Sequence, residues 1–247
     1  MSAALKLALA PVLVAQALHT RWRLPRLPEA EGAREGLAGG EARHAAPLRL
    51  LILGDSSAAG VGAATQDEAL AGQLSQALAR HSGRRVRWQL RARSGISSEQ
   101  ALGLLREAAL EPADVAVVVT GVNDVVGQLR PARALAARAA LLQALRAELG
   151  VRHTVLTPVP PMQRFAGLPQ PLRWVAGRDA RAHDLALQRW VAQQPGASWL
   201  PFDLPLAPQL LARDGFHPGP VAYRHWGEAL AAHITRQVLA GLLPGPG

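Results

Sequence analysis

Short apolar runs alternate with longer helical patterns along most of the chain. Apolar residues recur every three or four positions in the longer segments, which is typical of amphipathic helices, while runs of four to eight apolar residues predict buried strands. Strands that alternate with helices of this length favour a parallel sheet covered by helices on both faces. We therefore predict an α/β fold, a three-layer sandwich around a central five-stranded parallel sheet. The predicted strands are 48–53, 86–92, 114–120, 153–158 and 199–203, and the predicted helices are 67–80, 98–110, 133–149, 178–194 and 221–239.

The third predicted strand is the clearest. The run Val115-Ala116-Val117-Val118-Val119 is apolar without interruption and rich in β-branched residues, as expected of a central strand that is buried on both faces. Two helix starts are also well marked. Ser97-Ser98-Glu99-Gln100 supplies capping groups before one helix, and Pro218-Gly219-Pro220 precedes the last one.

The chain divides into three parts. Residues 1–24 are predicted as an apolar N-terminal helix, residues 25–47 as a linker rich in Pro, Gly, Glu and Arg, and residues 48–243 as a single α/β domain. A chain of 247 residues is long enough for such a domain with a sizeable core.

The role of the N-terminal helix has several readings. Ala15-Gln16-Ala17 fits a signal-peptide cleavage site, yet most of the positive charge follows the apolar run instead of preceding it. The run is also shorter than the roughly 20 residues that span a bilayer comfortably. An interfacial helix anchored by Arg and Trp, and a helix that packs on the domain, are equally open. These features favour a cytoplasmic or inner-membrane-associated protein over a secreted one.

Composition narrows the range of functions. The formal net charge is +9, but the arginines are scattered and no nucleic-acid-binding motif accompanies them, so we expect no nucleic-acid partner. The chain has no cysteine, which excludes disulfides, a thiol nucleophile and Cys-based metal sites. The sequence does not predict the oligomeric state.

Residues able to carry chemistry follow the predicted strands. Ser56 comes after the first strand, Gly95 after the second and Asn123 after the third, while Asp214 and His217 come after the fifth. Ligands bind beyond the carboxyl ends of the strands in an open parallel sheet. We therefore expect these five residues to meet at one edge of the sheet.

Together these residues favour nucleophilic catalysis. A serine hydroxyl needs a neighbouring base, which His217 supplies, and Asp214 can hold the imidazole in the useful tautomer. The backbone N–H groups of Ser56 and Gly95 and the side-chain amide of Asn123 are candidate donors to an oxyanion. Each residue alone is explained as well by an ordinary turn, cap or solvated pair. The favoured interpretation depends on all five occurring together.

These motifs resemble those of SGNH hydrolases of the GDSL esterase/lipase type. The matching blocks are Gly54-Asp55-Ser56, Gly95, Gly121-Val122-Asn123-Asp124 and Asp214-Gly215-Phe216-His217. The resemblance implies a flavodoxin-like three-layer fold, no metal or other cofactor, and serine-dependent hydrolysis of esters. It also implies that Ser56, not the adjacent Ser57, is the nucleophile, with His217 as base and Asp214 orienting it. Ser56, Gly95 and Asn123 would form the oxyanion hole, and Asp55 and Asp124 are expected to stabilise loops.

The sequence says less about the substrate than about the catalytic residues. The long loop 158–174 carries Met162, Phe165 and Leu168, which we expect to contact an acyl group, although they can equally well cap the core. We predict a serine esterase acting on short- to medium-chain acyl esters or lysophospholipid-like substrates, with membrane-surface association possible through residues 1–24. The alternatives are a carbohydrate O-deacetylase or acyltransferase on the same fold, and a non-enzymatic anion-binding module.

Overall fold

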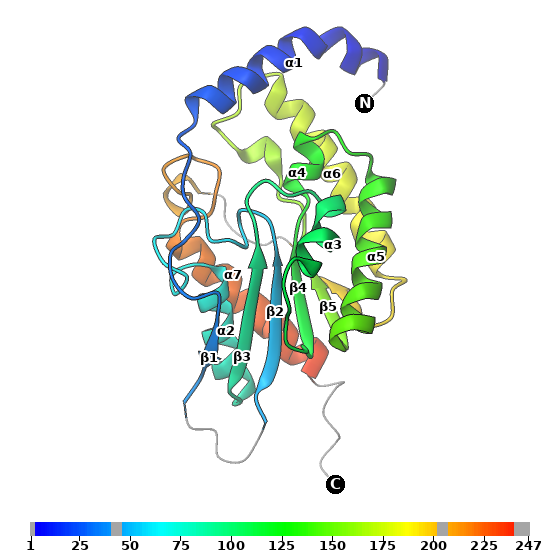
Figure 1. Ribbon diagram of the computed structural model, residues 1–247. Helices are drawn as coiled ribbons and strands as arrows, with labels where there is room; N and C mark the ends of the chain where they lie inside the picture. The colour runs from blue at the N-terminus through cyan, green and yellow to red at the C-terminus, as the bar shows by residue number, and fades with distance from the viewer. Residues whose placement is uncertain (1–2, 41–45, 202–206, 240–247) are drawn as a thin grey trace.

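A six-stranded sheet forms the middle layer of the protein (Figure 1). The computed structural model describes residues 3–40, 46–201 and 207–239. Five strands run parallel to one another, and the sixth pairs antiparallel with one of them at one edge of the sheet. The strands, in their order across the sheet, are β1 (Glu35–Ala38), β3 (Val86–Ala92), β2 (Leu48–Gly54), β4 (Val115–Val119), β5 (His153–Leu156) and β6 (Ala197–Trp199).

All five predicted strands are present, and the α/β fold with a mostly parallel sheet is confirmed. The predicted strand number of five is wrong by one, because β1 arises within the segment 25–47 that was expected to be a linker. Its sequence, Glu-Gly-Leu-Ala, has no apolar alternation, and Leu37 is more than half exposed. Main-chain hydrogen bonds to β3 therefore keep this edge strand in the sheet. Because main-chain pairing does not require apolar side chains, the sequence shows no hydrophobic pattern that predicts the strand. Residues 202–203 of the fifth predicted strand and 240–243 of the predicted domain lie outside the described residues.

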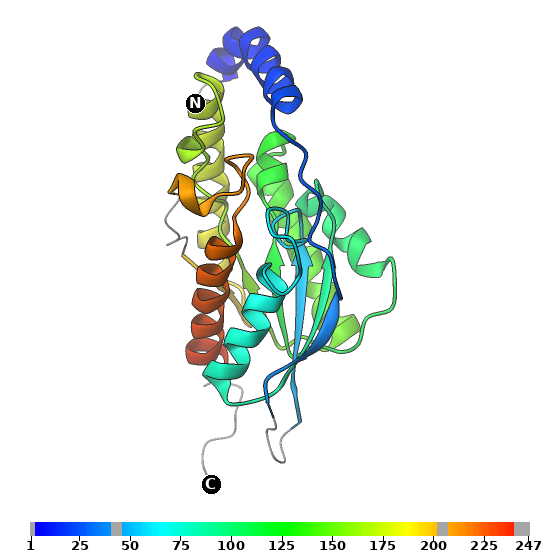
Figure 2. The ribbon, with the colours of Figure 1, turned by 90° about the vertical axis from the view of Figure 1, so that its left-hand side faces the viewer.

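Helices cover both faces of the sheet (Figure 2). The buried side chains of β2 belong to two different hydrophobic clusters, because successive side chains of a strand point to opposite faces of the sheet. Leu50 and Ile52 belong to the cluster under α2 and α7, whereas Leu51 and Leu53 belong to the cluster under α3, α5 and α6. The covering helices are α2 (Leu70–Ser82) and α7 (Pro220–His233) on one face, and α3 (Ser98–Arg106), α5 (Pro131–Leu149) and α6 (Leu172–Val191) on the other.

The expected helix starts are present. Ser97 and Gln100 form a reciprocal capping box at the start of α3, and Pro220 occupies the first turn of α7. Short helical elements complete the chain: α4 (Val122–Val126), η1 (Met162–Arg164), η2 (Pro208–Leu210) and η3 (Ile234–Leu239). The helix α4 was not predicted, because its five residues are fewer than the two turns that a periodic pattern requires.

The N-terminal helix α1 (Ala3–Arg23) lies across the end of the sheet at which the strand arrows point (Figures 1 and 2). It is tied to α6 by an ion pair between Lys6 Nζ and Asp179 Oδ2 at 2.5 Å. Gln16 binds the start of the same helix, accepting a hydrogen bond from the Leu172 N–H at 3.0 Å. Among the described residues, no helix combines the length and the apolar character needed to cross a bilayer.

Candidate active site

Ser56 occupies a tight turn at the carboxyl end of β2. The Asp55 N–H donates to the carbonyl of Val119 at the end of β4, at 2.9 Å, so the turn leans onto the neighbouring strand. Gly54 permits this approach, because a Cβ at that position would lie 2.3 Å from the Val119 oxygen. The Asp55 carboxylate then accepts a hydrogen bond from the Ser57 N–H at 3.0 Å. The turn is therefore fixed on both sides of Ser56.

His217 and Asp214 come from the loop between η2 and α7. One carboxylate oxygen of Asp214 accepts hydrogen bonds from the N–H groups of Phe216 at 2.9 Å and His217 at 3.0 Å. The other lies 2.6 Å from His217 Nδ1, and His217 Nε2 lies 2.9 Å from Ser56 Oγ. If Nδ1 carries the ring proton, Nε2 is the acceptor for the serine hydroxyl. The structure thus brings these three residues into one line of hydrogen bonds.

The charge of Asp214 favours this arrangement. Burial acts to raise the pKa of Asp214, but the hydrogen bonds from the His217 ring and from the backbone N–H groups of Phe216 and His217 outweigh it and lower the pKa. Asp214 is therefore ionised at neutral pH. An ionised acceptor at Nδ1 keeps the ring proton there and leaves Nε2 free to receive the Ser56 proton.

Two further predicted residues lie on the loops that follow β3 and β4. Gly95 is exposed and has a φ of +85°, a conformation that suits glycine. Asn123 lies in the first turn of α4 and donates from Nδ2 to the carbonyl of Ile96 at 2.9 Å. A carboxamide has two N–H groups, so one remains after this bond. The bond holds Asn123 beside the loop that carries Gly95.

A buried ion pair ties these two loops together more firmly. Asp124 accepts hydrogen bonds from the Ser98 N–H at 2.7 Å and from the Ser98 hydroxyl at 2.6 Å. Arg138 Nη2, on α5, lies 3.2 Å from the same carboxylate and donates to the Thr120 carbonyl at 3.1 Å. Both charged side chains are almost completely buried. The network therefore fixes the loops of Gly95 and Asn123 relative to each other.

The role of Arg138 was not predicted from the sequence, in which it is one of many scattered arginines. A signal was nevertheless present. Arg138 follows Ala134 by four positions and precedes Leu141 by three and Leu145 by seven, so it falls on the apolar side of α5. A charged residue at a core-facing position predicts a buried partner of opposite charge.

Asp55 is a buried carboxyl without a cationic partner among the described residues. Burial raises the pKa of Asp55 to about 6, and the hydrogen bond from the Ser57 N–H and the nearby His217 oppose this shift only in part. Asp55 and Asp124 both hold loops through hydrogen bonds, as the sequence led us to expect.

A small cavity of about 60 Å³ lies next to the hydrogen-bonded line of Ser56, His217 and Asp214. Its lining includes the neighbours of Ser56, which are Asp55 and Ser57, and the neighbours of His217, which are Phe216 and Pro218. Most of the remaining wall is apolar, formed by Val119, Val122, Pro158, Pro160, Phe165, Leu211, Ala222 and Trp226, with Thr120 and Thr157.

The three residues expected to contact an acyl group differ in their placement. Phe165 lines the cavity and packs on Phe216 with a ring-centroid distance of 4.7 Å. Met162 is buried in a cluster with Val159, and Leu168 packs against that cluster from outside. Neither Met162 nor Leu168 lines the cavity, so the alternative expectation, that loop residues cap the core, describes these two.

No group of three His, Asp or Glu side chains within residues 3–40, 46–201 and 207–239 is arranged to hold a metal ion. The hydrogen-bonded line of serine, imidazole and carboxylate is by itself an arrangement that can perform acyl transfer.

Comparison with known proteins identifies the class. The model of the GDSL-like lipase/acylhydrolase family matches residues 52–225, which hold the serine, glycine and asparagine blocks and the histidine block. The chain therefore belongs to this family, and the resemblance found in the sequence is confirmed. Members of the family are ester-bond hydrolases, and so is this protein.

Individual relatives agree with this assignment. The GDSL-like esterase Rv1075c of Mycobacterium tuberculosis is 29% identical over 244 residues, which cover 90% of this chain and 74% of the relative. The fold is similar to that of the lipase Lip_vut3 from a goat rumen metagenome, with a TM-score of 0.61, 19% identity, and 75% of this chain and 96% of that one covered. It is also similar to Axe2, an acetyl-xylooligosaccharide esterase from Geobacillus, with a TM-score of 0.58, 16% identity, and coverages of 76% and 94%.

The buried pair of Asp124 and Arg138 generates a stability prediction. Replacement of Arg138 by Met leaves the Asp124 carboxylate buried without its cation, so we expect a loss of about 3–5 kcal/mol in the free energy of unfolding. The matched control is Arg133→Met on the same helix, whose ion pair with Glu99 is exposed and should contribute less than about 1 kcal/mol. Urea unfolding followed by circular dichroism measures both.

The double variant Arg138→Met with Asp124→Asn separates charge from packing. It should recover part of the loss, because no unpaired charge remains buried. Equal stabilities for the Arg138→Met and Arg133→Met variants would contradict the proposed role of the pair.

The raised pKa of Asp55 predicts how stability depends on pH. The pKa of Asp55 is about 6 in the folded chain and 3.8 for the unperturbed group. Between these two pH values Asp55 ionises more readily in the unfolded chain, so a rise in pH favours unfolding. The stabilisation is therefore present below the unfolded pKa and is lost as the pH rises through about 6. Relative to Asp55→Asn, the unmodified protein should lose on the order of 3 kcal/mol between about pH 3 and pH 7. Urea unfolding of both proteins across this range measures the difference, and a pH-independent difference would refute the assignment.

Proposed function

We propose that this protein cleaves carboxylic esters through an acyl-enzyme formed on Ser56, with His217 as general base and Asp214 as the residue that orients it. The observation that carries the proposal is the continuous line from Ser56 Oγ to His217 Nε2 at 2.9 Å and from His217 Nδ1 to Asp214 Oδ2 at 2.6 Å. These distances lie within the range needed for direct proton transfer between the serine and the imidazole.

The reaction proceeds in two halves. Ser56 Oγ attacks the ester carbonyl carbon while its proton passes to His217 Nε2, which gives a tetrahedral oxyanion. Collapse of this intermediate breaks the bond to the leaving oxygen, which takes the proton from His217. Water then attacks the acyl-enzyme by the same route, releases the acid and restores Ser56. Asp214 remains ionised throughout and stabilises the imidazolium that forms in each half.

The oxyanion needs donors that are already in place. We assign the backbone N–H of Ser56, the backbone N–H of Gly95 and the remaining N–H of Asn123 to this role. Two hydrogen bonds between the loops support this assignment, one from Asn123 to the Ile96 carbonyl and one from the Ser98 N–H to Asp124. They fix the loops that carry Gly95 and Asn123 relative to each other. Donors fixed before the reaction stabilise the developing charge without a reorganisation cost.

The acyl group is short to medium in length, and the cavity lined by Phe165 favours the short end of this range. A volume of about 60 Å³ is room for a few water molecules or a short acyl chain. The same cavity suits removal of an acetyl group from a carbohydrate, and the activity named for Axe2 gives that candidate its support.

Replacement of Ser56 tests the nucleophile. We expect Ser56→Ala to lower kcat/KM for p-nitrophenyl acetate at least ~10³-fold, because the acyl-enzyme can no longer form. The matched control is Ser57→Ala, which removes the adjacent hydroxyl but keeps the backbone N–H that binds Asp55, and it should retain activity within about tenfold. Circular dichroism checks that both variants fold. Loss of activity in Ser57→Ala with retention in Ser56→Ala would reverse the assignment.

Replacement of Phe165 tests the acyl pocket. Phe165→Val enlarges the cavity, so the ratio of kcat/KM for p-nitrophenyl octanoate to that for the acetate should rise at least about tenfold, since each added methylene in an apolar pocket is worth ~1–3 kcal/mol. Leu168→Ala is the control, because Leu168 packs nearby without lining the cavity and should leave the ratio unchanged. An unchanged ratio in Phe165→Val would exclude this cavity as the acyl site.

A further inference from the structure

The outward side of α1 is apolar. Leu7, Pro11, Val14, Leu18 and Trp22 recur at intervals of three or four residues, so they form one stripe along the helix. All five are exposed, with Leu7 74%, Leu18 64% and Trp22 83% accessible to solvent. Single exposed apolar residues are common on proteins, but a stripe that runs the length of a helix marks an interaction surface.

The two polar residues within the apolar run of α1 point the other way. Lys6 and Gln16 are the two polar side chains within the apolar run 3–18, and both contact the protein. Lys6 Nζ lies 2.5 Å from Asp179 Oδ2 and 3.1 Å from Gln128 Oε1, and Gln16 Nε2 donates to the Gln170 carbonyl at 2.6 Å. The usual amphipathic order of a surface helix is therefore reversed. The contacts to α6 fix the helix with its apolar stripe outward.

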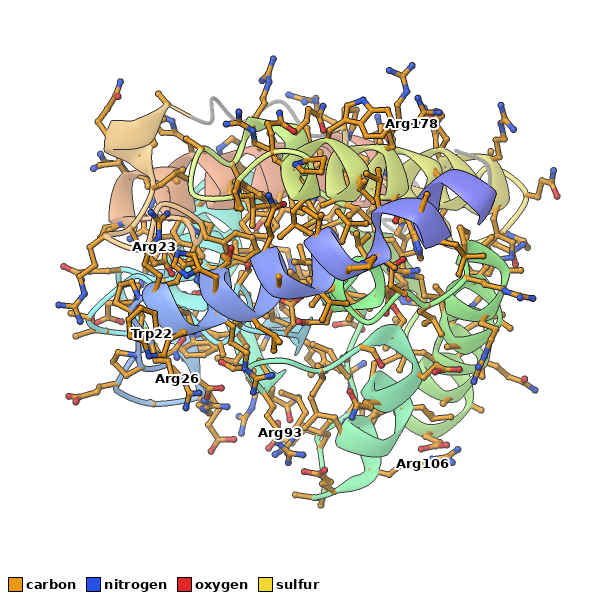
Figure 3. The ribbon with its side chains drawn as sticks, turned by 90° about the horizontal axis from the view of Figure 1, so that it is seen from above. Trp22, Arg23, Arg26, Arg93, Arg106 and Arg178 are labelled. Atoms are coloured by element: carbon orange, nitrogen blue, oxygen red, sulfur yellow. The ribbon has the colours of Figure 1, made fainter. Side chains whose placement is uncertain are left out.

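Positive charge borders the stripe. Residues 1–28 contain four basic residues and no acidic one. Seen from above the helix, Trp22 and Arg23 lie at its C-terminal end with Arg26 just beyond (Figure 3). Arg178 appears above α1 in this view, and its guanidinium stacks on the Trp174 ring at 5.4 Å from the centroid.

Not every arginine on this face adds net charge. Arg93 and Arg106, which appear below α1 in Figure 3, form ion pairs with Glu107 and Glu148 respectively. Among the described residues, Arg21, Arg23 and Arg26 have no carboxylate within ion-pair distance, so the segment 21–26 at the C-terminal end of the helix keeps its positive charge. This end carries both the exposed indole of Trp22 and the basic side chains, a combination typical of anchoring at a lipid headgroup layer.

The same end of α1 lies beside the catalytic loops. Arg23 Nη2 donates to the Gly167 carbonyl at 3.4 Å. A Cβ at Gly167 would lie 3.8 Å from both the Leu24 side chain and the Asp214 carbonyl oxygen. The stripe therefore lies on the same end of the molecule as Ser56, His217 and Asp214.

We propose that α1 docks flat on an anionic membrane surface, with its apolar stripe in the interface and the arginines of segment 21–26 at the level of the phosphates. Docking in this orientation presents the catalytic end of the sheet to the lipid. An anionic bilayer supplies both an apolar layer and the negative charge that this surface lacks. A second copy of this chain matches it less well, because residues 1–28 offer no carboxylate to the opposing arginines.

Vesicle binding tests the proposal independently of hydrolysis, since it is measured on the full chain carrying Ser56→Ala. We expect cosedimentation with vesicles of phosphatidylglycerol and phosphatidylcholine, and much weaker binding to phosphatidylcholine alone or at high salt. Leu18→Gln with Trp22→Ser should lower the partition coefficient at least about tenfold, because two apolar side chains leave the interface. Arg23→Gln should lower it about fivefold on anionic vesicles only.

The matched control is Leu37→Gln with Leu185→Gln, two exposed apolar residues on β1 and α6. This variant should bind within about twofold of the parent. The proposal would be overturned if the partition coefficient fell equally in both double variants. It would also be overturned if the protein bound anionic and neutral vesicles equally well. Self-association without lipid that disappears in Leu18→Gln with Trp22→Ser would overturn it too, because it would assign the stripe to a second copy. An intact mass showing that the protein isolated from cells lacks α1 would overturn it as well.

Discussion

The close contact between the ends of β2 and β4 is the constraint on which the site depends. Only a glycine at position 54 allows the chain to pass the Val119 carbonyl, and the Asp55 N–H then bonds to that oxygen. The chain leaves β2 toward β3 on one side and returns to β4 on the other, so the loops that follow β2 and β4 diverge at this point. Such a switch point opens a crevice in a parallel sheet. Ser56 is held at that crevice, within reach of the loop that carries His217.

Three buried carboxylates surround the crevice, and each is stabilised differently. Asp214 accepts two backbone N–H groups and the His217 ring, which together lower its pKa despite burial. Asp124 is compensated by Arg138 and Ser98. Asp55 has one backbone donor and no cation beside it, so burial dominates and raises its pKa. Asp55, next to Ser56, is thus the one whose ionisation opposes folding, while hydrogen-bond donors stabilise the charge of Asp214, and Ser98 and Arg138 stabilise the charge of Asp124.

The sequence predicted those features that leave a pattern in it. The β-branched run of β4 and the turn residues after each parallel strand were sufficient for the sheet, and parallel topology then brought Ser56, Asp214 and His217 together. Features held by main-chain pairing or by tertiary contact were missed. The edge strand β1 has no apolar alternation, and the five residues of α4 are too few for a helical period. The burial of Met162 depends on how the loop 158–174 folds back on α6, which no local pattern encodes.

The helix α1 shows why hydrophobicity along a sequence does not decide which side of a helix is buried. An apolar run interrupted by Lys6 and Gln16 suits a helix buried on its apolar side, and also one fixed by its polar side. The partners supplied by the domain, Asp179 and the backbone around Gln170, select the second arrangement. The energetic consequence follows directly. In the proposed docking, the lipid layer removes the apolar surface of α1 from water, and the same step brings the end of the sheet that carries Ser56 to the lipid surface.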